Sequence, residues 1–236
     1  MHAYAASHYN LVHMAQRMFM ESDGLVDWLE KVPAFPNATH KQVGSIVMNC
    51  NPFTLGHKHI LATALSKVDY LYLFVVEEDK SNFKFPERWK LIKEGVAEFG
   101  DKICMVPSGK FIISSLSFPE YFQKDKIEYT PDTTNEILMF GTILAPYLGI
   151  SKRFFGEEPY CHVTKAHHEQ MKELLPLCGV ECVEIPRKPH DGSAISASRV
   201  RKLLEEGELE ELSKIVPVTT FRHLLKKYRQ ANKDAA

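Results

Sequence analysis

The sequence has few cysteines and no long apolar run, and both absences limit what the protein can be. Its five cysteines are an odd number scattered along 236 residues, which does not fit a disulfide framework. No apolar run approaches the roughly 18 residues that span a bilayer. Residues 1–10 lack the basic start and apolar core of a secretory signal. We therefore expect a protein of the reducing cytoplasm without a membrane segment.

Net charge is also nearly absent, because 29 lysines and arginines balance 30 aspartates and glutamates to give −1. This balance argues against a broad electrostatic surface for nucleic acid, although it still allows a local basic cleft. Cys178 and Cys182 lack a second ligand pair at zinc-site spacing, so no protein-held metal is predicted. The sequence contains no internal repeat, which leaves one domain with short extensions.

Short apolar runs alternate with longer segments of helical spacing. The helical segments cover residues 57–68, 86–99, 133–148 and 164–177. Alternation of strand and helix predicts an α/β, Rossmann-like fold with a five-stranded, mostly parallel sheet and helices on both faces. The five runs that read as buried strands are residues 44–49, 69–76, 102–107, 152–156 and 180–186.

Composition divides the chain into three parts. Residues 1–40 read as a helical extension that ends in a proline-rich link, and residues 41–216 read as the α/β domain. Residues 217–236 contain the stretch FRHLLKKYRQ, which predicts a basic amphipathic helix. We interpret both flanks as accessory, with packing or solvation favoured over a binding role.

The stretch NPFTLGHKHI, residues 51–60, follows the first predicted strand and enters a helix. Ligands of open parallel sheets bind at the carboxyl ends of the strands. Gly56 allows a phosphate to approach the backbone, and the helix start offers free N–H groups and a positive dipole end. His57 could donate a hydrogen bond to a phosphate oxygen, with Lys58 as a further donor. A capped helix with a surface histidine is the alternative.

A second helix start, ISASR at residues 195–199, follows the last predicted strand. Ser196 is a good N-cap, so simple capping is one explanation. Serines followed by Arg199 in the first turn also suit an anion. Two such sites, one after the first strand and one after the last, fit a polyphosphate that lies across the sheet.

The two stretches resemble signature motifs of the nucleotidyltransferase superfamily, which includes class I aminoacyl-tRNA synthetases and small adenylyl- and cytidylyltransferases. TLGH at residues 54–57 resembles the T/HxGH motif, and ISASR resembles the ISxxR motif. Over about residues 44–204 the chain also resembles the catalytic domain of the citrate lyase ligase family. The most telling segment is IISSLSFPEYF, residues 112–122, because the general motifs do not require it.

The resemblance implies a nucleotidyltransferase domain over residues 41–216 that uses ATP and Mg²⁺. Acetate would attack the α-phosphate to give acetyl-adenylate and pyrophosphate. The prosthetic-group thiol of the citrate lyase acyl carrier protein would then take the acetyl group and release AMP. The family usually carries an acetyltransferase-like domain ahead of this one, and 40 residues are too few for it, so the acyl acceptor could differ.

The resemblance also implies roles for individual residues. Thr54, His57, Lys58, Ser196 and Arg199 would form the catalytic set. Residues implied to bind the nucleotide are Asn49, Asn51, Phe53, Gly56, Gly156, Glu157, Glu158, Thr164, Ile195 and Ser198. Residues implied to face acetate or the incoming thiol arm are Lys110, Ser114, Ser115, Phe118 and Lys124.

Two alternatives stay open. The same motifs would serve a small-molecule adenylyl- or cytidylyltransferase, such as an enzyme similar to phosphopantetheine adenylyltransferase, which needs a phosphorylated acceptor. They would also serve a nucleotide-binding module without catalysis, although the intact His57, Ser196 and Arg199 argue against it. Nucleic acid and membrane partners are not expected.

Overall fold

The computed structural model describes residues 24–36, 38, 40–123 and 126–234, and for residues 231–234 the backbone only. Lys124, one of the predicted substrate residues, lies outside the described residues, as does most of the predicted extension over residues 1–40. Within that extension, α2 (Leu25–Glu30) is described, and Leu25 and Leu29 are buried.

The core is a five-stranded sheet in which every neighbouring pair is parallel. The order β3-β2-β1-β4-β5 places the first strand at the centre, as in doubly wound nucleotide-binding folds. The predicted α/β class and the five predicted strands are confirmed. The strands are β1 (Val43–Met48), β2 (Tyr70–Val75), β3 (Ile103–Pro107), β4 (Ile150–Gly156) and β5 (Glu181–Ile185).

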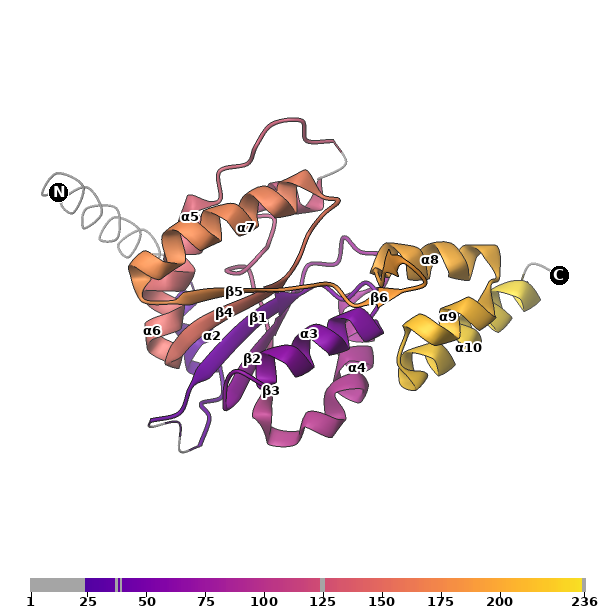
Figure 1. The fold of residues 1–236 in the computed structure, drawn as a ribbon, viewed down its shortest axis with the longest axis horizontal. Helices are drawn as coiled ribbons and strands as arrows, with labels where there is room; N and C mark the ends of the chain where they lie inside the picture. Colours follow the sequence, from indigo (N-terminus) through magenta and orange to yellow (C-terminus); the bar gives the residue numbers. More distant parts are fainter. Residues whose placement is uncertain (1–23, 37, 39, 124–125, 235–236) are drawn as a thin grey trace, which may run out of the picture.

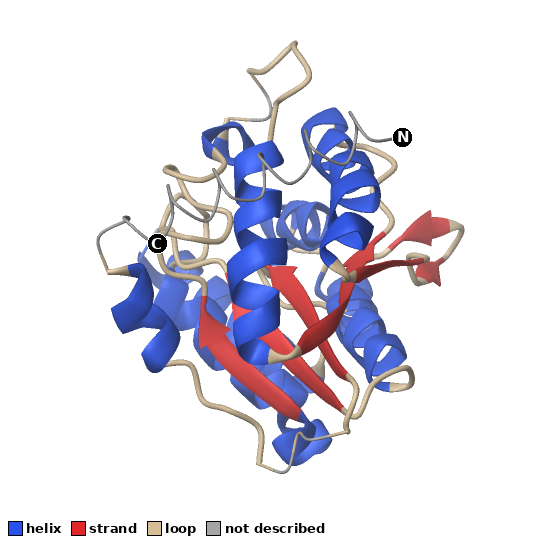
Figure 2. Cartoon of the chain, turned by 90° about the vertical axis from the view of Figure 1, so that its left-hand side faces the viewer, coloured by secondary structure: helices blue, strands red, loops and turns tan. Residues whose placement is uncertain are grey.

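Helices cover both faces of the sheet (Figures 1 and 2). Leu71 and Leu73 of β2 pack in the cluster that holds α3 (Leu55–Leu65) and α4 (Phe85–Val96). Tyr72 and Phe74, which alternate with them, belong to the cluster of the opposite face. The elements of that second face are α2, α5 (Thr134–Met139), α6 (Ala145–Leu148) and α7 (His162–Leu174).

Short helical turns complete the described α/β core. A π-helical segment, η3 (Phe140–Leu144), joins α5 to α6, so the helix predicted over residues 133–148 forms with a widened turn. The 3₁₀ turns are η1 (Ala97–Lys102), η2 (Pro119–Phe122) and η4 (Leu175–Cys178).

The carboxyl-terminal elements form a helical cluster beside the sheet (Figure 1). A hairpin of β6 (Pro189–His190) and β7 (Ser193–Ala194) leads into α8 (Ala197–Glu206), α9 (Leu209–Ile215) and α10 (Val218–Asp234). These helices share a small core with Phe83, and α10 is tied to α4 through His223 and Lys227 on Glu87. The boundary at residue 217 stays a prediction. In the part of the chain that is described, no helix has the length and apolarity to cross a membrane.

Candidate active site

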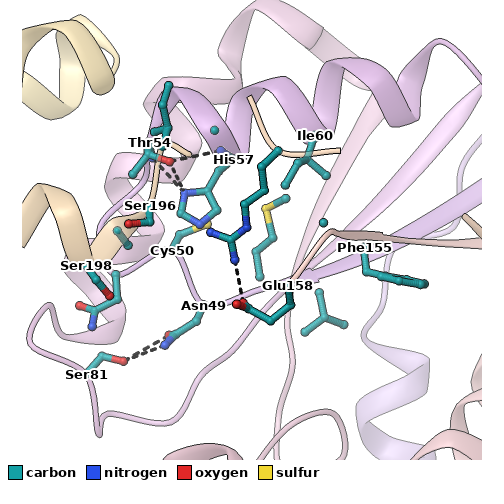
Figure 3. Close-up of a pocket in the computed structure, with 18 of the residues that line it drawn as sticks. Asn49, Cys50, Thr54, His57, Ile60, Ser81, Phe155, Glu158, Ser196 and Ser198 are labelled. Carbon is teal, nitrogen blue, oxygen red and sulfur yellow. Dashed lines mark hydrogen bonds and ion pairs between the residues drawn. The ribbon is translucent and has the colours of Figure 1, made fainter. Parts of the chain in front are cut away.

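A pocket of about 490 Å³ lies where the carboxyl ends of β1 and β4 meet the starts of α3 and α8 (Figure 3). It brings together most of the residues predicted to hold the nucleotide. Its basic lining residues are Lys80, Arg187, Lys188 and Arg201, and its acidic ones are Glu157 and Glu158, so cations outnumber carboxylates. The predicted residues that line it are Asn49, Asn51, Thr54, Gly56, His57, Gly156, Glu157, Glu158, Ile195, Ser196 and Ser198.

His57 sits in the first turn of α3 and is held by a capping box. Thr54 Oγ1 accepts a hydrogen bond from the His57 backbone N–H at 3.2 Å, and His57 Nδ1 accepts one from the Thr54 backbone N–H at 3.0 Å. Because Nδ1 is an acceptor, the neutral ring carries its proton on Nε2. Burial, together with the positive charge of Arg187, lowers the pKa of His57 to about 4. At neutral pH the ring is therefore an uncharged N–H donor beside the pocket.

Two glycines explain how the two motifs come together. A Cβ atom at Gly56 would stand 3.0 Å from the carbonyl oxygen of Ile195, so the start of α3 touches the segment that leads into α8. A Cβ at Gly156 would stand 2.7 Å from Ile60 Cδ1, where the end of β4 meets α3. A side chain at Gly56 would push the two helix starts apart, and glycine permits the close approach.

The start of α8 sends its two arginines, Arg199 and Arg201, in different directions. Ser196 caps the helix by accepting from the Arg199 backbone N–H at 3.1 Å. The Arg199 guanidinium donates to the His190 carbonyl at 3.1 Å, and Arg199 is not among the residues that line the pocket. Arg201 lines it instead, and donates to the Asn51 carbonyl at 2.7 Å and to Ser198 Oγ at 3.0 Å.

Arg187 is a pocket residue that the motifs did not predict. Its Nη2 atom pairs with Glu158 Oε2 at 2.7 Å, an ion pair drawn in Figure 3, and its Nε atom donates to the Glu157 carbonyl at 2.7 Å. Glu158 Oε1 also accepts from the backbone N–H groups of Tyr160 and Cys161, both at 3.1 Å. The carboxylate thus orients the arginine. The signal available in the sequence was a pair of cations directly after the fifth strand.

Another arginine holds the loops below the pocket. Arg88 of α4 is fully buried and donates to the carbonyls of Asn49 at 2.9 Å, Val76 at 2.6 Å and Phe83 at 3.0 Å. The Asn49 and Val76 carbonyls directly follow the ends of β1 and β2, so one side chain fixes both strand exits. Asn49 Nδ2 donates to Ser81 Oγ at 3.0 Å, and Asn51 Nδ2 to Asn82 Oδ1 at 3.3 Å.

Three predicted residues lie off the pocket. Phe53 is fully buried and packs behind the His57 ring at 5.8 Å between centroids. Lys58 forms an ion pair with Glu98 at 2.6 Å. Thr164 donates to Cys161 Sγ at 3.3 Å. None of the three is among the lining residues, so Phe53 positions the histidine and the other two make local contacts.

The predicted acetate segment forms a layer behind the pocket. Ser114 Oγ donates to the Lys110 carbonyl at 2.7 Å. Ser115 is hydrogen-bonded to Glu78 and, at 2.5 Å, to Lys80, which itself lines the pocket. Phe118 is buried. Lys110, Ser114, Ser115 and Phe118 are not lining residues, whereas Tyr121 and Phe122 at the end of the same segment are.

A doubly wound parallel sheet, with T-x-G-H and I-S-x-x-R helix starts meeting at one pocket, defines the nucleotidyltransferase class. Within that class the chain belongs to the citrate lyase ligase family. The family model described as "Citrate lyase ligase C-terminal domain" matches residues 43–224, from β1 into α10. The resemblance read from the sequence is thereby confirmed.

Curated relatives carry the same family name. The chain is 38% identical over 190 residues to the [Citrate [pro-3S]-lyase] ligase of Klebsiella pneumoniae, covering 78% of this chain and 55% of that protein. It is 40% identical over 192 residues to the enzyme of that name from Haemophilus influenzae, covering 78% and 57%. The chain thus spans a little over half the length of these relatives.

A solved structure shares the fold. A structure titled as a macrolide-efflux protein from Streptococcus pneumoniae has a TM-score of 0.51 and 13% sequence identity, covering 80% of this chain and 60% of that one. At this identity the likeness concerns the fold alone.

Proposed function

We propose that this chain is an ATP-dependent acetate ligase that acetylates the prosthetic-group thiol of the citrate lyase acyl carrier protein. The observation that carries the proposal is the contact of Gly56 with the Ile195 carbonyl, which puts the starts of α3 and α8 at one pocket. Relatives named [Citrate [pro-3S]-lyase] ligase support the choice of reaction within the nucleotidyltransferase class.

In the first step an acetate oxygen attacks the α-phosphorus of ATP. The new P–O bond forms as the bond to the β-phosphate breaks, which gives acetyl-adenylate and pyrophosphate. The neutral His57 donates its Nε2–H to the phosphate oxygen on which charge builds. Arg187 and Arg201, with the N–H groups of the α8 start, hold the remaining phosphate charge.

In the second step the carrier thiol, as thiolate, attacks the acetyl carbon, and AMP leaves with the electrons of the broken C–O bond. No protein nucleophile is needed in either step, so the residues act by positioning and by neutralising charge. Gly156 would let the adenosine approach the end of β4. Lys110, Ser114, Ser115 and Phe118 would act through the residues they support, since they do not line the pocket.

Mg²⁺ fits this pocket only as a companion of the triphosphate. Glu157 and Glu158 are the carboxylates among the described lining residues, and Glu158 is engaged by Arg187 and two backbone N–H groups. Phosphate oxygens and water would therefore supply most ligands of the ion, and Glu157 is the lining carboxylate that could add one from the protein. When bound, the ion would neutralise charge on the phosphates. Because the reaction uses ATP and a free carrier thiol, we propose the reducing cytoplasm as its location.

The decisive assay is exchange of labelled pyrophosphate into ATP. We expect exchange that depends on acetate, and a loss of at least about a hundredfold in the rate for His57→Ala, with ATP affinity changed little. His59→Ala is the matched control, because His59 lies on the same helix and is not a lining residue.

Exchange that occurs without any carboxylate would remove the ligase assignment. So would the absence of exchange with every acid in a series of short carboxylic acids. Pyrophosphate release that needs a phosphorylated acceptor would point to the adenylyl- or cytidylyltransferase reaction instead. ATP binding without turnover toward any acceptor would leave a nucleotide-binding module.

A further inference from the structure

Three buried ionisable side chains meet behind the pocket, on the face of the sheet that α5 and α7 cover. They are Glu136 of α5, Arg153 of β4 and His167 of α7, and the most exposed of them shows only 3% of its surface. Each keeps one buried atom without a hydrogen-bond partner, namely Glu136 Oε1, Arg153 Nη1 and His167 Nε2. Burying such groups is costly, and apolar residues would often stabilise a core as well or better.

The hydrogen bonds around His167 fix the position of its proton. Gln170 Nε2 donates to the Pro131 carbonyl at 2.7 Å, so Gln170 Oε1 is the acceptor for the Thr133 backbone N–H at 2.8 Å and for its hydroxyl at 2.9 Å. The Thr133 hydroxyl proton is used in that bond. Thr133 Oγ1 must therefore accept from His167 Nδ1–H, 2.9 Å away. The neutral ring then turns the lone pair of Nε2 toward Glu136 Oε2, at 3.6 Å, which is just beyond hydrogen-bond distance.

An ionised Glu136 would face that lone pair with a second acceptor, whereas a protonated Glu136 offers it a hydrogen, which a small approach of the two side chains would turn into a hydrogen bond. Burial raises the pKa of Glu136 to about 7, and the charge of Arg153 opposes the rise. Burial, with smaller effects of His168 and Arg153, lowers the pKa of His167 well below its usual range. Cys182 of β5 also faces Arg153 and favours its charged form, which opposes the lowering of the Arg153 pKa by burial. Of these two side chains, the Glu136 carboxyl therefore binds a proton more readily than the His167 ring.

The pair supports one wall of the pocket. We name this aromatic wall by its lining residues Tyr121, Phe155 and His168. Phe118 packs on the His167 ring at 4.9 Å and on the Tyr121 ring at 5.9 Å. His168 follows His167 in the chain, and its ring packs at a tilt against Phe155, 4.4 Å between centroids.

The aromatic wall lies away from the phosphate-binding helix start. In Figure 3 Phe155 stands on the side of the pocket opposite Ser196 and Ser198. In the proposed reaction the carboxylate substrate approaches the α-phosphate from the side opposite to the leaving pyrophosphate. Phe155 stands on that side, next to Gly156 at the end of β4, so the wall is suited to the carboxylate while Gly156 leaves room for the adenosine.

We propose that Glu136 and His167 form a buried positioning pair that shares one proton, and that this proton holds the aromatic wall in the geometry that receives the carboxylate substrate. The identity of that substrate rests on the proposed function, whereas the shared proton does not. Loss of the proton turns two acceptors toward each other, which separates His167 from α5 and displaces the rings packed on it. Neither side chain touches the reacting atoms.

The first test needs no activity. Nitrogen-15 NMR of the histidine rings, with the His167 signals assigned through His167→Gln, should show the Nδ1–H tautomer from pH 6 to 8. The Nε2 shift should change with a midpoint near 7 and lose this change in Glu136→Gln, whose amide donates at every pH. A His167 ring that becomes imidazolium near pH 6.5, or that carries its proton on Nε2, would overturn the proposal.

The second test measures Michaelis constants in the exchange assay. Glu136→Ala should raise the KM for acetate about tenfold at pH 7, the loss expected for one unpaired buried group, with the KM for ATP within about twofold of wild type. Glu136→Gln should restore the acetate KM and make it independent of pH from 6 to 8. Glu173→Gln, at an exposed position of the same helix α7, is the control and should behave as wild type.

Equal increases in both Michaelis constants, or no rescue by Gln, would refute positioning of the wall. If Glu136→Ala fails to fold, the comparison of Glu136→Gln with wild type across pH still decides the matter. Failure of every short acid in the assay would refute the proposed function instead, and the NMR result would then decide on the shared proton alone.

Discussion

Replacing Glu136 by Gln should change how the stability of the fold depends on pH. Glu136 is 2% exposed, and its pKa rises from 4.5 to about 7 on folding, chiefly because burial disfavours the charged carboxylate. The folded chain therefore binds a proton that the unfolded chain releases between these values. Stability contributed by that proton is present at the acid end and is lost as pH rises through the window.

The size of the effect follows from the same values. A rise from 4.5 to about 7 corresponds to about 3 kcal/mol of unfolding free energy, which wild type loses between pH 4.5 and 8 and Glu136→Gln does not. The buried His167 and His168 act in the opposite direction, because their lowered pKa values favour the folded state as pH rises. Both proteins retain these histidines, so the difference between the two curves isolates Glu136.

The assay is urea unfolding at half-unit steps of pH, with the free energy extrapolated to water. The free energy of unfolding of Glu136→Gln minus that of wild type should be about 2–3 kcal/mol larger at pH 8 than at pH 4.5. Glu173→Gln, at an exposed position of α7, should follow the wild-type curve. If the curves of wild type and Glu136→Gln run parallel, the carboxyl does not hold its proton in the fold, and the reasoning fails.

Three further predictions concern the pocket. Since the pKa of His57 is about 4, the exchange rate should show no loss from protonation of this ring between pH 5.5 and 8. A titration step with a midpoint near 6.5 in the pH–rate profile of wild type, absent from that of His57→Ala, would contradict this prediction. Gly56→Val should weaken ATP binding about tenfold in calorimetry, because its Cβ meets the Ile195 carbonyl at 3.0 Å. Unchanged affinity would show that ATP binding does not need the close contact between the starts of α3 and α8. Arg201→Ala should weaken ATP binding more than Arg199→Ala does, because Arg201 lines the pocket. The reverse order would support Arg199, the arginine of the I-S-x-x-R motif, as the phosphate ligand.

Much of the fold was predictable because the strand signals were strong. The apolar runs 69–76 and 102–107 are rich in aliphatic and aromatic residues and became β2 and β3 with nearly the predicted bounds. The helix over residues 133–148 contains a π turn at Phe140–Leu144, which no periodicity in the sequence announces. The motifs located the pocket, because both helix starts line it.

Individual side chains were harder to predict than the pocket itself. The segment 112–122 is the most telling part of the family resemblance, yet its residues Ser114 and Phe118 turn into a layer behind the lining, held by local hydrogen bonds and ring contacts. Arg187 was missed because it belongs to no motif, and its place depends on an ion pair with Glu158, 29 positions earlier in the chain. Contacts of this kind arise from the fold and leave no local pattern.

Arg201 lines the pocket and Arg199 does not, and this difference separates what the motif determines from what packing determines. Residues two apart on a helix point about 200° away from each other, so only one of these arginines can face the pocket. Val200, which lies between them, is fully buried in the small core of α8, α9 and Phe83. Burying Val200 sets the rotation of α8 about its axis, which sends Arg199 toward the hairpin at His190 and Arg201 toward Asn51. The motif therefore places a helix start at the pocket, and the apolar side of that helix selects the guanidinium that faces it.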